Sequence, residues 1–213
     1  HVQYMQGLAG NVRPRAVADL ETMRFRGGSP EKLEQAGKDL AADVLAALGK
    51  KAERVELDFA GASDRPFLPR GTPPSREVYE KMAADSSNRY LQSVGEYWLK
   101  RYNSGEGFSK GDAWPVGLIR LARGHYIAHM AGEPVVEWRA KIEQWLSPNR
   151  VVTLGYSQEA STYLPTEGLL PEGGYEVLEA NRARLSSPAP FAPGIEKAME
   201  QSFRRQFSFL EAK

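Results

Sequence analysis

The chain has 213 residues, enough for one domain of ordinary size that buries about 70% of its unfolded surface. Its 28 basic and 27 acidic residues nearly balance, so its charge predicts neither nucleic acid nor anionic lipid as a partner. Cysteine is absent, which excludes disulfides, thiolate metal ligands and cysteine nucleophiles. No apolar stretch approaches the roughly 20 residues of a bilayer crossing, so we expect no transmembrane segment.

The first residues predict a strand that leads into a loop. His1 to Gln6 alternates as strand residues do, and it lacks the regions of a signal peptide. Gly7 to Pro14 contains two glycines, an asparagine and a proline, which favour a tight loop whose backbone amides face a ligand. Because the strand has no preceding turn and the chain no initiator methionine, we expect His1 to mark a processing point within a longer protein.

A long helix and a strand are predicted next. Ser29 and Pro30 form a helix start and Gly49 a stop, with the intervening apolar residues at helical spacing and expected to face a core, namely Leu33, Leu40, Val44 and Leu48. Val55 to Phe59 alternates and predicts a strand. The proline-rich residues from Arg65 to Ser75 predict an extended excursion over the surface.

The middle of the chain predicts a helical pair followed by a hairpin. Arg76 to Tyr102 has a helical pattern that could divide near Asp85 to Asn88, and Gly105 to Gly111 reads as a loop. Pro115 to Leu121 and His125 to Met130 predict two strands around the turn at Arg123 and Gly124.

A strand-to-helix junction and a long loop complete the pattern. Val135 to Leu146 predicts a helix, which places Glu133 at the junction between a strand and that helix. Val151 to Gly155 predicts a short buried strand, and the polar loop from Tyr156 to Gly174 is long enough to suggest a functional role. Ile195 to Phe209 predicts a final amphipathic helix.

Four stretches, in this order, resemble the neutral, non-lysosomal ceramidase family over nearly the whole chain. They are Gln6 to Pro14, a glycine-rich strand end; Ala128 to Pro134, ending in Ala-Gly-Glu-Pro where the family has Pro-Gly-Glu; Gly155 to Thr166, with Tyr163; and Glu172 to Val177, with Tyr175. The resemblance implies an α/β fold of layered sheet and helices, in which residues 1–213 form the carboxy-terminal part of a single catalytic domain.

The resemblance also implies a zinc site. In the family, the glutamate and the first tyrosine bind zinc together with two histidines, which assigns Glu133 and Tyr163 to the metal. A carboxylate and a phenolate are acceptable oxygen ligands of zinc. Tyr175 resembles the residue that supports the carbonyl oxygen as it becomes an oxyanion. Gly10 and Asn11 would shape the floor of the pocket.

Two departures from the family pattern matter. The histidine ligands of the family lie upstream of the first glycine-rich loop, so we expect an upstream amino-terminal half of the same precursor, or a companion chain, to supply them. His1, His125 and His129 are not assigned to the metal. Arg13 stands where ceramidases have a serine before the proline, so we expect metal-activated water, not an acyl-serine, to attack the amide.

Each candidate residue also has an ordinary structural interpretation. Glu133 suits the first turn of a helix, where the macrodipole favours negative charge, and Tyr163 and Tyr175 could be packing residues. The glycines and Asn11 could simply shape a turn. Arg13 is either a solvated loop charge or a clamp for an anionic substrate group. We interpret His129 as a hydrogen-bonded structural histidine, because a strand does not bring it close to Glu133.

The sequence therefore predicts a zinc-dependent hydrolase of an amide bond, with an N-acyl lipid such as ceramide as the substrate class that the resemblance implies. We expect the chain alone to be inactive. The alternatives are a metal-free binding or structural module on the same fold, and a hydrolase of a soluble amide or ester. The resemblance implies a secreted or periplasmic location.

Overall fold

In a computed structural model, the structure describes residues 3–159 and 161–212. This part of the chain forms two compact units, one made of residues 3–11 and 58–212 and the other of Val12–Leu57. The first unit carries the sheet and the predicted metal ligands. The prediction of one catalytic domain over residues 1–213 stays a prediction.

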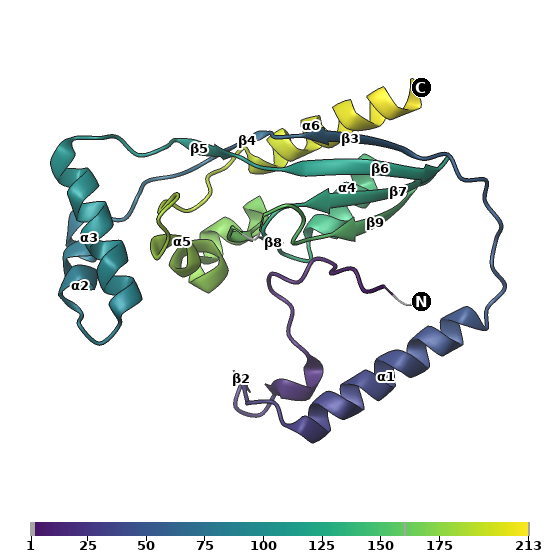
Figure 1. Ribbon diagram of the computed structural model, residues 1–213, viewed down its shortest axis with the longest axis horizontal. Helices are drawn as coiled ribbons and strands as arrows, with labels where there is room; N and C mark the ends of the chain where they lie inside the picture. Colours follow the sequence, from purple (N-terminus) through teal and green to yellow (C-terminus); the bar gives the residue numbers. More distant parts are fainter. Residues whose placement is uncertain (1–2, 160, 213) are drawn as a thin grey trace. The chain divides into compact units, whose positions relative to one another are not determined.

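A mixed four-stranded sheet is the centre of the first unit (Figure 1). Its strands, in spatial order, are β3 (Ala60–Asp64), β6 (Val116–Ala122), β7 (His125–Met130) and β9 (Arg150–Leu154). The pairs β3–β6 and β6–β7 are antiparallel, and β7–β9 is parallel. The predicted hairpin is confirmed, because Gly124 turns the chain between β6 and β7 with a φ of 77° that suits glycine. The α/β class is also confirmed.

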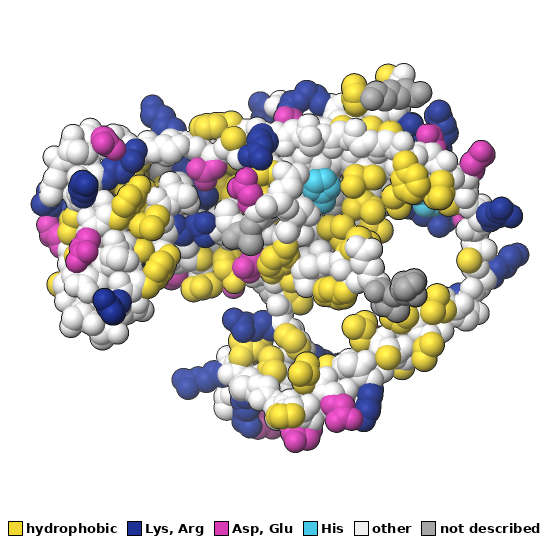
Figure 2. Space-filling model, viewed as in Figure 1, with side chains coloured by type: hydrophobic (Ala, Val, Ile, Leu, Met, Phe, Trp, Pro, Cys, Tyr) yellow, Lys and Arg dark blue, Asp and Glu magenta, His cyan; other side chains and the backbone are white. Residues whose placement is uncertain are grey.

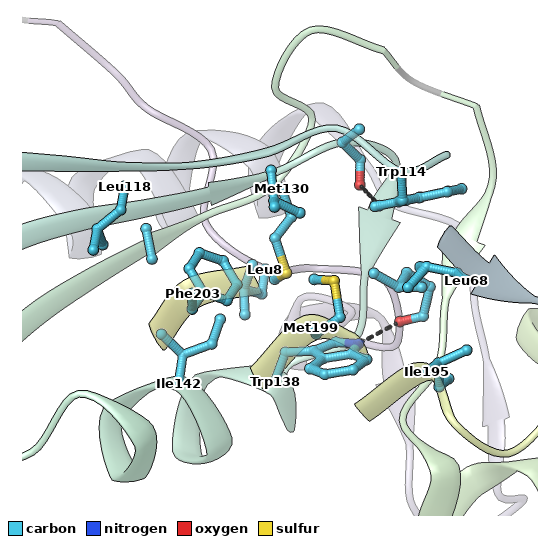
Figure 3. Packing of buried hydrophobic residues seen from close by; sticks show 14 of the residues in the cluster. Leu8, Leu68, Trp114, Leu118, Met130, Trp138, Ile142, Ile195, Met199 and Phe203 are labelled. Atoms are coloured by element: carbon cyan, nitrogen blue, oxygen red, sulfur yellow. Dashed lines mark hydrogen bonds between the residues drawn. The ribbon is translucent and has the colours of Figure 1, made fainter. Parts of the chain in front are cut away.

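Two helices cover one face of this sheet, α4 (Trp138–Trp145) and α6 (Ile195–Glu211). Figure 3 shows side chains of both helices converging on residues of the strands, and the fully buried members include Leu118, Met130, Trp138, Met199 and Phe203. The α6 helix confirms the predicted amphipathic ending. The Trp138 indole N–H also donates to the Leu164 carbonyl at 2.9 Å, which ties the core to the segment that carries Tyr163.

A helical pair stands beside the sheet within the same unit. Helices α2 (Arg76–Ala84) and α3 (Arg89–Ser104) divide where the sequence predicts, and the Asn88 side chain caps α3 by accepting from the Leu91 N–H. Their interface has its own aromatic cluster, which includes Tyr79, Trp98 and Phe108. The proline-rich segment before them forms β4 (Phe67–Pro69), which pairs with β5 (Gly111–Ala113).

Short elements follow the sheet and lead to the last helix. They are β8 (Glu133–Pro134), β10 (Tyr163–Leu164), η2 (Glu167–Glu172), η3 (Tyr175–Glu179) and α5 (Ala180–Arg182). Strands β8 and β10 form a parallel pair of their own. No helix of the described residues is long and apolar enough to cross a membrane.

The second unit contains α1 (Pro30–Leu48), which begins and ends as predicted, together with η1 (Arg15–Val17), β1 (Ala18–Asp19) and β2 (Arg24–Phe25). The Ser29 hydroxyl accepts from the Lys32 N–H at 3.3 Å, as an N-cap should. The prediction that the apolar stripe of α1 faces a core is wrong for the described structure. Leu33 is 76% exposed, and Figure 2 shows hydrophobic side chains gathered along α1.

Three strand predictions are wrong. Residues 3–6 form no strand, because only the Gln6 carbonyl pairs, with the Gly155 N–H at 3.1 Å; residues 1–2 lie outside the described part. Val55 to Phe59 is not a strand either, since the strand begins at Ala60 and only Asp58 of this segment bonds to β6, through its N–H to the Leu121 carbonyl at 2.8 Å. The β9 strand exists but is not buried, with Val152 54% exposed.

The helix predicted from Val135 begins at Trp138 instead. Glu133 and Pro134 pair with β10, so the chain stays extended until the Trp138 N–H bonds to the Val135 carbonyl at 3.3 Å. Glu133 therefore lies in a strand rather than in the first turn of a helix.

Candidate active site

Glu133 and Tyr163 lie side by side because β8 and β10 pair in register. The Glu133 N–H donates to the Thr162 carbonyl at 2.8 Å, and the Val135 N–H donates to the Leu164 carbonyl at 3.1 Å. Burial, followed by a hydrogen bond with the Glu133 carboxylate, raises the pKa of Tyr163 to about 12. Tyr163 is therefore a neutral phenol at pH 7 whose hydroxyl contacts a carboxylate.

Two glycines allow the backbone around Glu133 to pack this closely. Gly132 has a φ of 72°, and a Cβ there would lie 2.4 Å from the Thr162 carbonyl oxygen and 2.5 Å from the Trp114 ring. A Cβ at Gly10 would lie 2.4 Å from the Glu133 carbonyl oxygen, and the Gly10 N–H donates to the Pro134 carbonyl at 2.9 Å. The predicted pocket-floor residue Gly10 thus supports the backbone of Glu133.

Tyr175 joins this pair from the opposite side. It opens η3 directly after Gly173 and Gly174, whose positive φ values of 67° and 80° turn the chain back toward β10. The Tyr175 ring meets the Tyr163 ring edge to face, with centroids 5.6 Å apart and planes at 73°. Tyr175 is 57% exposed, so its hydroxyl is accessible to a ligand.

The three predicted residues border one cavity of about 640 Å³. Its other walls come from α2, α3 and the segment around α5, and include Met82, Asn88, Tyr90, Leu91, Ser161, Thr162, Glu179, Ala180, Arg182, Ala183 and Arg184. A cavity of this size lies within the range of small-molecule sites. The structure therefore brings Glu133, Tyr163 and Tyr175 together at one site.

Tyr156 is a site residue that the sequence interpretation missed. Its N–H donates to the Gly132 carbonyl at 2.9 Å, which brings its side chain back toward Glu133. Burial, and then the charge of the Glu133 carboxylate and a hydrogen bond to it, raise the pKa of Tyr156. Its position at the start of the long polar loop was the sole sequence signal. Two tyrosine hydroxyls therefore contact the Glu133 carboxylate.

A buried polar network behind the cavity was also missed. Arg70, whose side chain is 2% exposed, donates to Asp112 at 2.7 Å, to the Asn181 side-chain oxygen at 2.8 Å and to the Ala189 carbonyl at 3.0 Å. The Thr162 hydroxyl also donates to the Asn181 oxygen, at 3.3 Å. Because Thr162 precedes Tyr163 and Asn181 follows the η3 turn that carries Tyr175, this network positions both tyrosine segments.

Asn11 does not line this cavity. The Asn11 amide donates to both carboxylate oxygens of Glu137, at 2.9 and 2.8 Å, and its side-chain oxygen accepts from the Val136 N–H at 3.0 Å. Asn11 thus holds the turn that leads into α4. Arg13 belongs to the second unit, where its guanidinium lies over the Phe25 ring, 5.1 Å from the centroid. Their roles in substrate binding stay predictions.

The interpretation of His129 as a hydrogen-bonded residue requires correction. Its Nδ1 is buried and has no hydrogen-bond partner among the described residues, because the ring lies against Gly117 across the hairpin. Burial lowers the pKa of His129 below its ordinary value, which favours the neutral ring. His125 contacts the Arg123 carbonyl at 3.1 Å through its Nδ1.

The described residues do not form a complete metal site by themselves. Within residues 3–159 and 161–212, no three histidine or acidic side chains come together in a way that could hold a metal ion. Glu133 and Tyr163 offer two neighbouring oxygen donors, which fits half of a four-coordinate zinc site. A zinc ion held by this pair would need further donors besides these two side chains.

Comparison with solved structures gives a likeness in fold. No family model and no curated protein sequence matches the chain. Among solved structures, the neutral ceramidase from Pseudomonas aeruginosa superposes with a TM-score of 0.58 and 14% sequence identity. The chain is similar in fold to part of a neutral ceramidase. The match covers 98% of this chain and 37% of the ceramidase chain, and at this identity the likeness to the neutral ceramidase shows the fold alone.

Proposed function

We propose that this chain is the carboxy-terminal part of a zinc-dependent amidase that cleaves an N-acyl amide, with a lipid such as ceramide as its substrate. The observation that carries the proposal is the meeting of Glu133, Tyr163 and Tyr175 at one cavity, in a fold similar to part of a neutral ceramidase. These are the three residues for which the sequence resemblance implies metal and oxyanion roles.

Glu133 and Tyr163 would hold the metal. Their oxygens are neighbours across β8 and β10, and binding a cation at the phenol would require loss of the Tyr163 proton. Zinc, when bound, supplies Lewis acidity that acidifies water and polarises a carbonyl. Tyr156 would orient the Glu133 carboxylate through its hydroxyl, as residues behind metal ligands commonly do.

Tyr175 would act on the substrate. Its exposed hydroxyl can donate to the amide oxygen as negative charge develops there, which lowers the barrier to attack on the carbonyl carbon. With Arg13 in place of the serine, the proposed reaction is direct attack by water, which releases a carboxylate and an amine.

The missing histidines would come from an amino-terminal half of the same precursor or from a companion chain. Two surfaces support this partner. Ile119, Ile127 and Val152 lie on the sheet face opposite α4 and α6, and Figure 2 shows hydrophobic side chains gathered over β7 and β9. The apolar stripe of α1 is also exposed. Exposed apolar patches often mark interaction sites, so we propose that the amino-terminal half covers this face of the sheet.

Two alternative functions also agree with features of the described residues. A metal-free binding module on the same fold would agree with the incomplete ligand set of the described residues and with Arg13 at the serine position. A hydrolase of a soluble amide or ester would use the same three residues. By the same likeness, we propose an extracytoplasmic location for the amidase.

The test is the hydrolysis of N-dodecanoylsphingosine and of N-acetyl amino acids by the assembly that is co-purified with this chain. We expect hydrolysis of the lipid amide that a chelator abolishes and that added zinc restores. Activity that survives complete removal of metal would contradict the proposal. Zinc-dependent cleavage of the soluble amides alone would support the second alternative.

A further inference from the structure

The cavity of the proposed active site has a cationic end that the proposed chemistry does not use. Arg182 and Arg184 line the same cavity as Glu133 and Tyr163, together with Tyr90. Neither arginine belongs to the stretches for which the sequence resemblance implies a role. Two guanidinium groups in a cavity that also holds a predicted catalytic centre call for a partner of opposite charge.

The acidic residues of the same cavity do not neutralise this end. Glu179 pairs with Arg182 at 3.0 Å, and the Glu133 carboxylate is contacted by tyrosine hydroxyls. The guanidinium of Arg184 has no hydrogen-bond or ion-pair partner among residues 3–159 and 161–212. Asp112 interacts with it only through its charge, since that carboxylate is already bonded to Arg70. One positive charge therefore remains uncompensated.

Hydrogen bonds from α3 hold the backbone at Arg184, and its side chain is half-buried. Its backbone carbonyl accepts from the Trp98 indole N–H at 2.5 Å, and the Tyr90 hydroxyl donates to the carbonyl of the preceding Ala183 at 2.7 Å. Half-burial lowers the pKa of the Arg184 guanidinium below its ordinary value, yet arginine stays charged at neutral pH. A partly desolvated cation binds an oxyanion more strongly than a fully solvated side chain does.

We propose that this end of the cavity binds an anionic group, a carboxylate or a phosphate, on the amide substrate. This inference rests on the proposed function, because it names the substrate class of the same site. Among N-acyl amides, the site would bind those with a negative charge more tightly than neutral ones such as ceramide, with Met82 and Leu91 lining the same cavity. A neutral ceramide would leave Arg184 without a counter-charge.

Calorimetric titration of the co-purified assembly, stripped of metal with a chelator, tests this inference without any need for hydrolysis. The probes are N-octanoylglycine, its neutral methyl amide, phosphorylated N-octanoylethanolamine and inorganic phosphate. We expect at least one charged amide to bind about tenfold more tightly than the methyl amide at low salt, an advantage that shrinks as salt rises. The tighter of the two charged amides identifies the preferred anion, and tight binding of inorganic phosphate would show that the anion needs no acyl chain.

Two variants separate the arginine from general charge effects. Arg184→Gln should abolish the advantage of the charged amide and leave binding of the methyl amide unchanged. Arg139→Gln, on an exposed face of α4, should leave both unchanged. The inference is overturned if no probe binds, if charged and neutral amides bind equally, or if the advantage survives in Arg184→Gln. If the assembly binds charged amides more tightly than neutral ones but binds no zinc, the anion site stands and the proposed zinc-dependent function is contradicted.

Discussion

Replacing Tyr175 with phenylalanine is expected to lower kcat for amide hydrolysis about 100-fold in the zinc-loaded assembly. The substitution removes only the hydroxyl, and the ring contact with Tyr163 remains because phenylalanine has the same shape. Donors to a developing oxyanion act mainly in the transition state, so KM should change much less than kcat. Steady-state kinetics on the co-purified assembly, with zinc content measured in parallel, checks the expectation.

Tyr97→Phe is the matched control for this experiment. Tyr97 is a partly exposed tyrosine of α3 whose ring packs edge to face on Trp98, and it does not line the cavity. Its replacement should leave kcat unchanged. Wild-type kcat in Tyr175→Phe would remove the oxyanion role, whereas a parallel loss of zinc would show that Tyr175 instead supports the metal ligands.

Arg70→Leu is expected to lower the free energy of unfolding of the first unit by about 3 kcal/mol, the lower end of the range for breaking a buried ion pair. The variant leaves Asp112 without its guanidinium, and removes a donor from Asn181 and from the Ala189 carbonyl. The lower end applies because the Asp112 side chain is 28% exposed and water can solvate part of its charge. Denaturant unfolding followed by tryptophan fluorescence measures the change.

The double variant Arg70→Leu/Asp112→Leu should recover part of the lost stability, since it removes the uncompensated carboxylate. Arg139→Leu breaks an exposed i,i+4 pair with Glu143 and should change stability by less than about 1 kcal/mol. Equal stability of Arg70→Leu and wild type would mean that the network does not hold the segments of Tyr163 and Tyr175.

The sequence correctly predicted helix starts and turns that depend on neighbouring residues. Ser29 with Pro30 starts α1, Asn88 starts α3, and Gly124 turns the hairpin, each through a contact or a dihedral angle within a few residues. The alternation from Val55 to Phe59 did not predict a strand correctly, because a strand also needs a paired neighbour and only Asp58 of this segment bonds to β6 before the ladder starts at Ala60. An alternating pattern indicates a strand, but it does not show which other strand pairs with it.

The candidate site was only partly visible in the sequence. Glu133, Tyr163 and Tyr175 could be named from a resemblance to motifs, but their meeting depends on β8 and β10, two strands of two residues each. Tyr156 and Arg70 were missed because their partners are distant in sequence: Arg70 bonds to Asp112 and Asn181. No period or cap in a sequence encodes such contacts.

The α1 helix illustrates a different limit. Its spacing correctly indicates which residues share an apolar face, such as Leu33 and Leu40, but it does not indicate what covers that face. In the described structure this face is exposed, which agrees with the proposal that an amino-terminal half packs against the chain.

The most direct test of the proposed site is the zinc content of the co-purified assembly, compared between wild type, Glu133→Ala, Tyr163→Phe and the control Glu143→Ala. Glu143 is an acidic residue of α4 that pairs with Arg139 away from the cavity. We expect close to one zinc per wild-type and Glu143→Ala assembly, zinc lost in Glu133→Ala, and weaker retention in Tyr163→Phe. A wild-type assembly that stays metal-free after incubation with zinc, or full zinc in Glu133→Ala, would contradict the metal site.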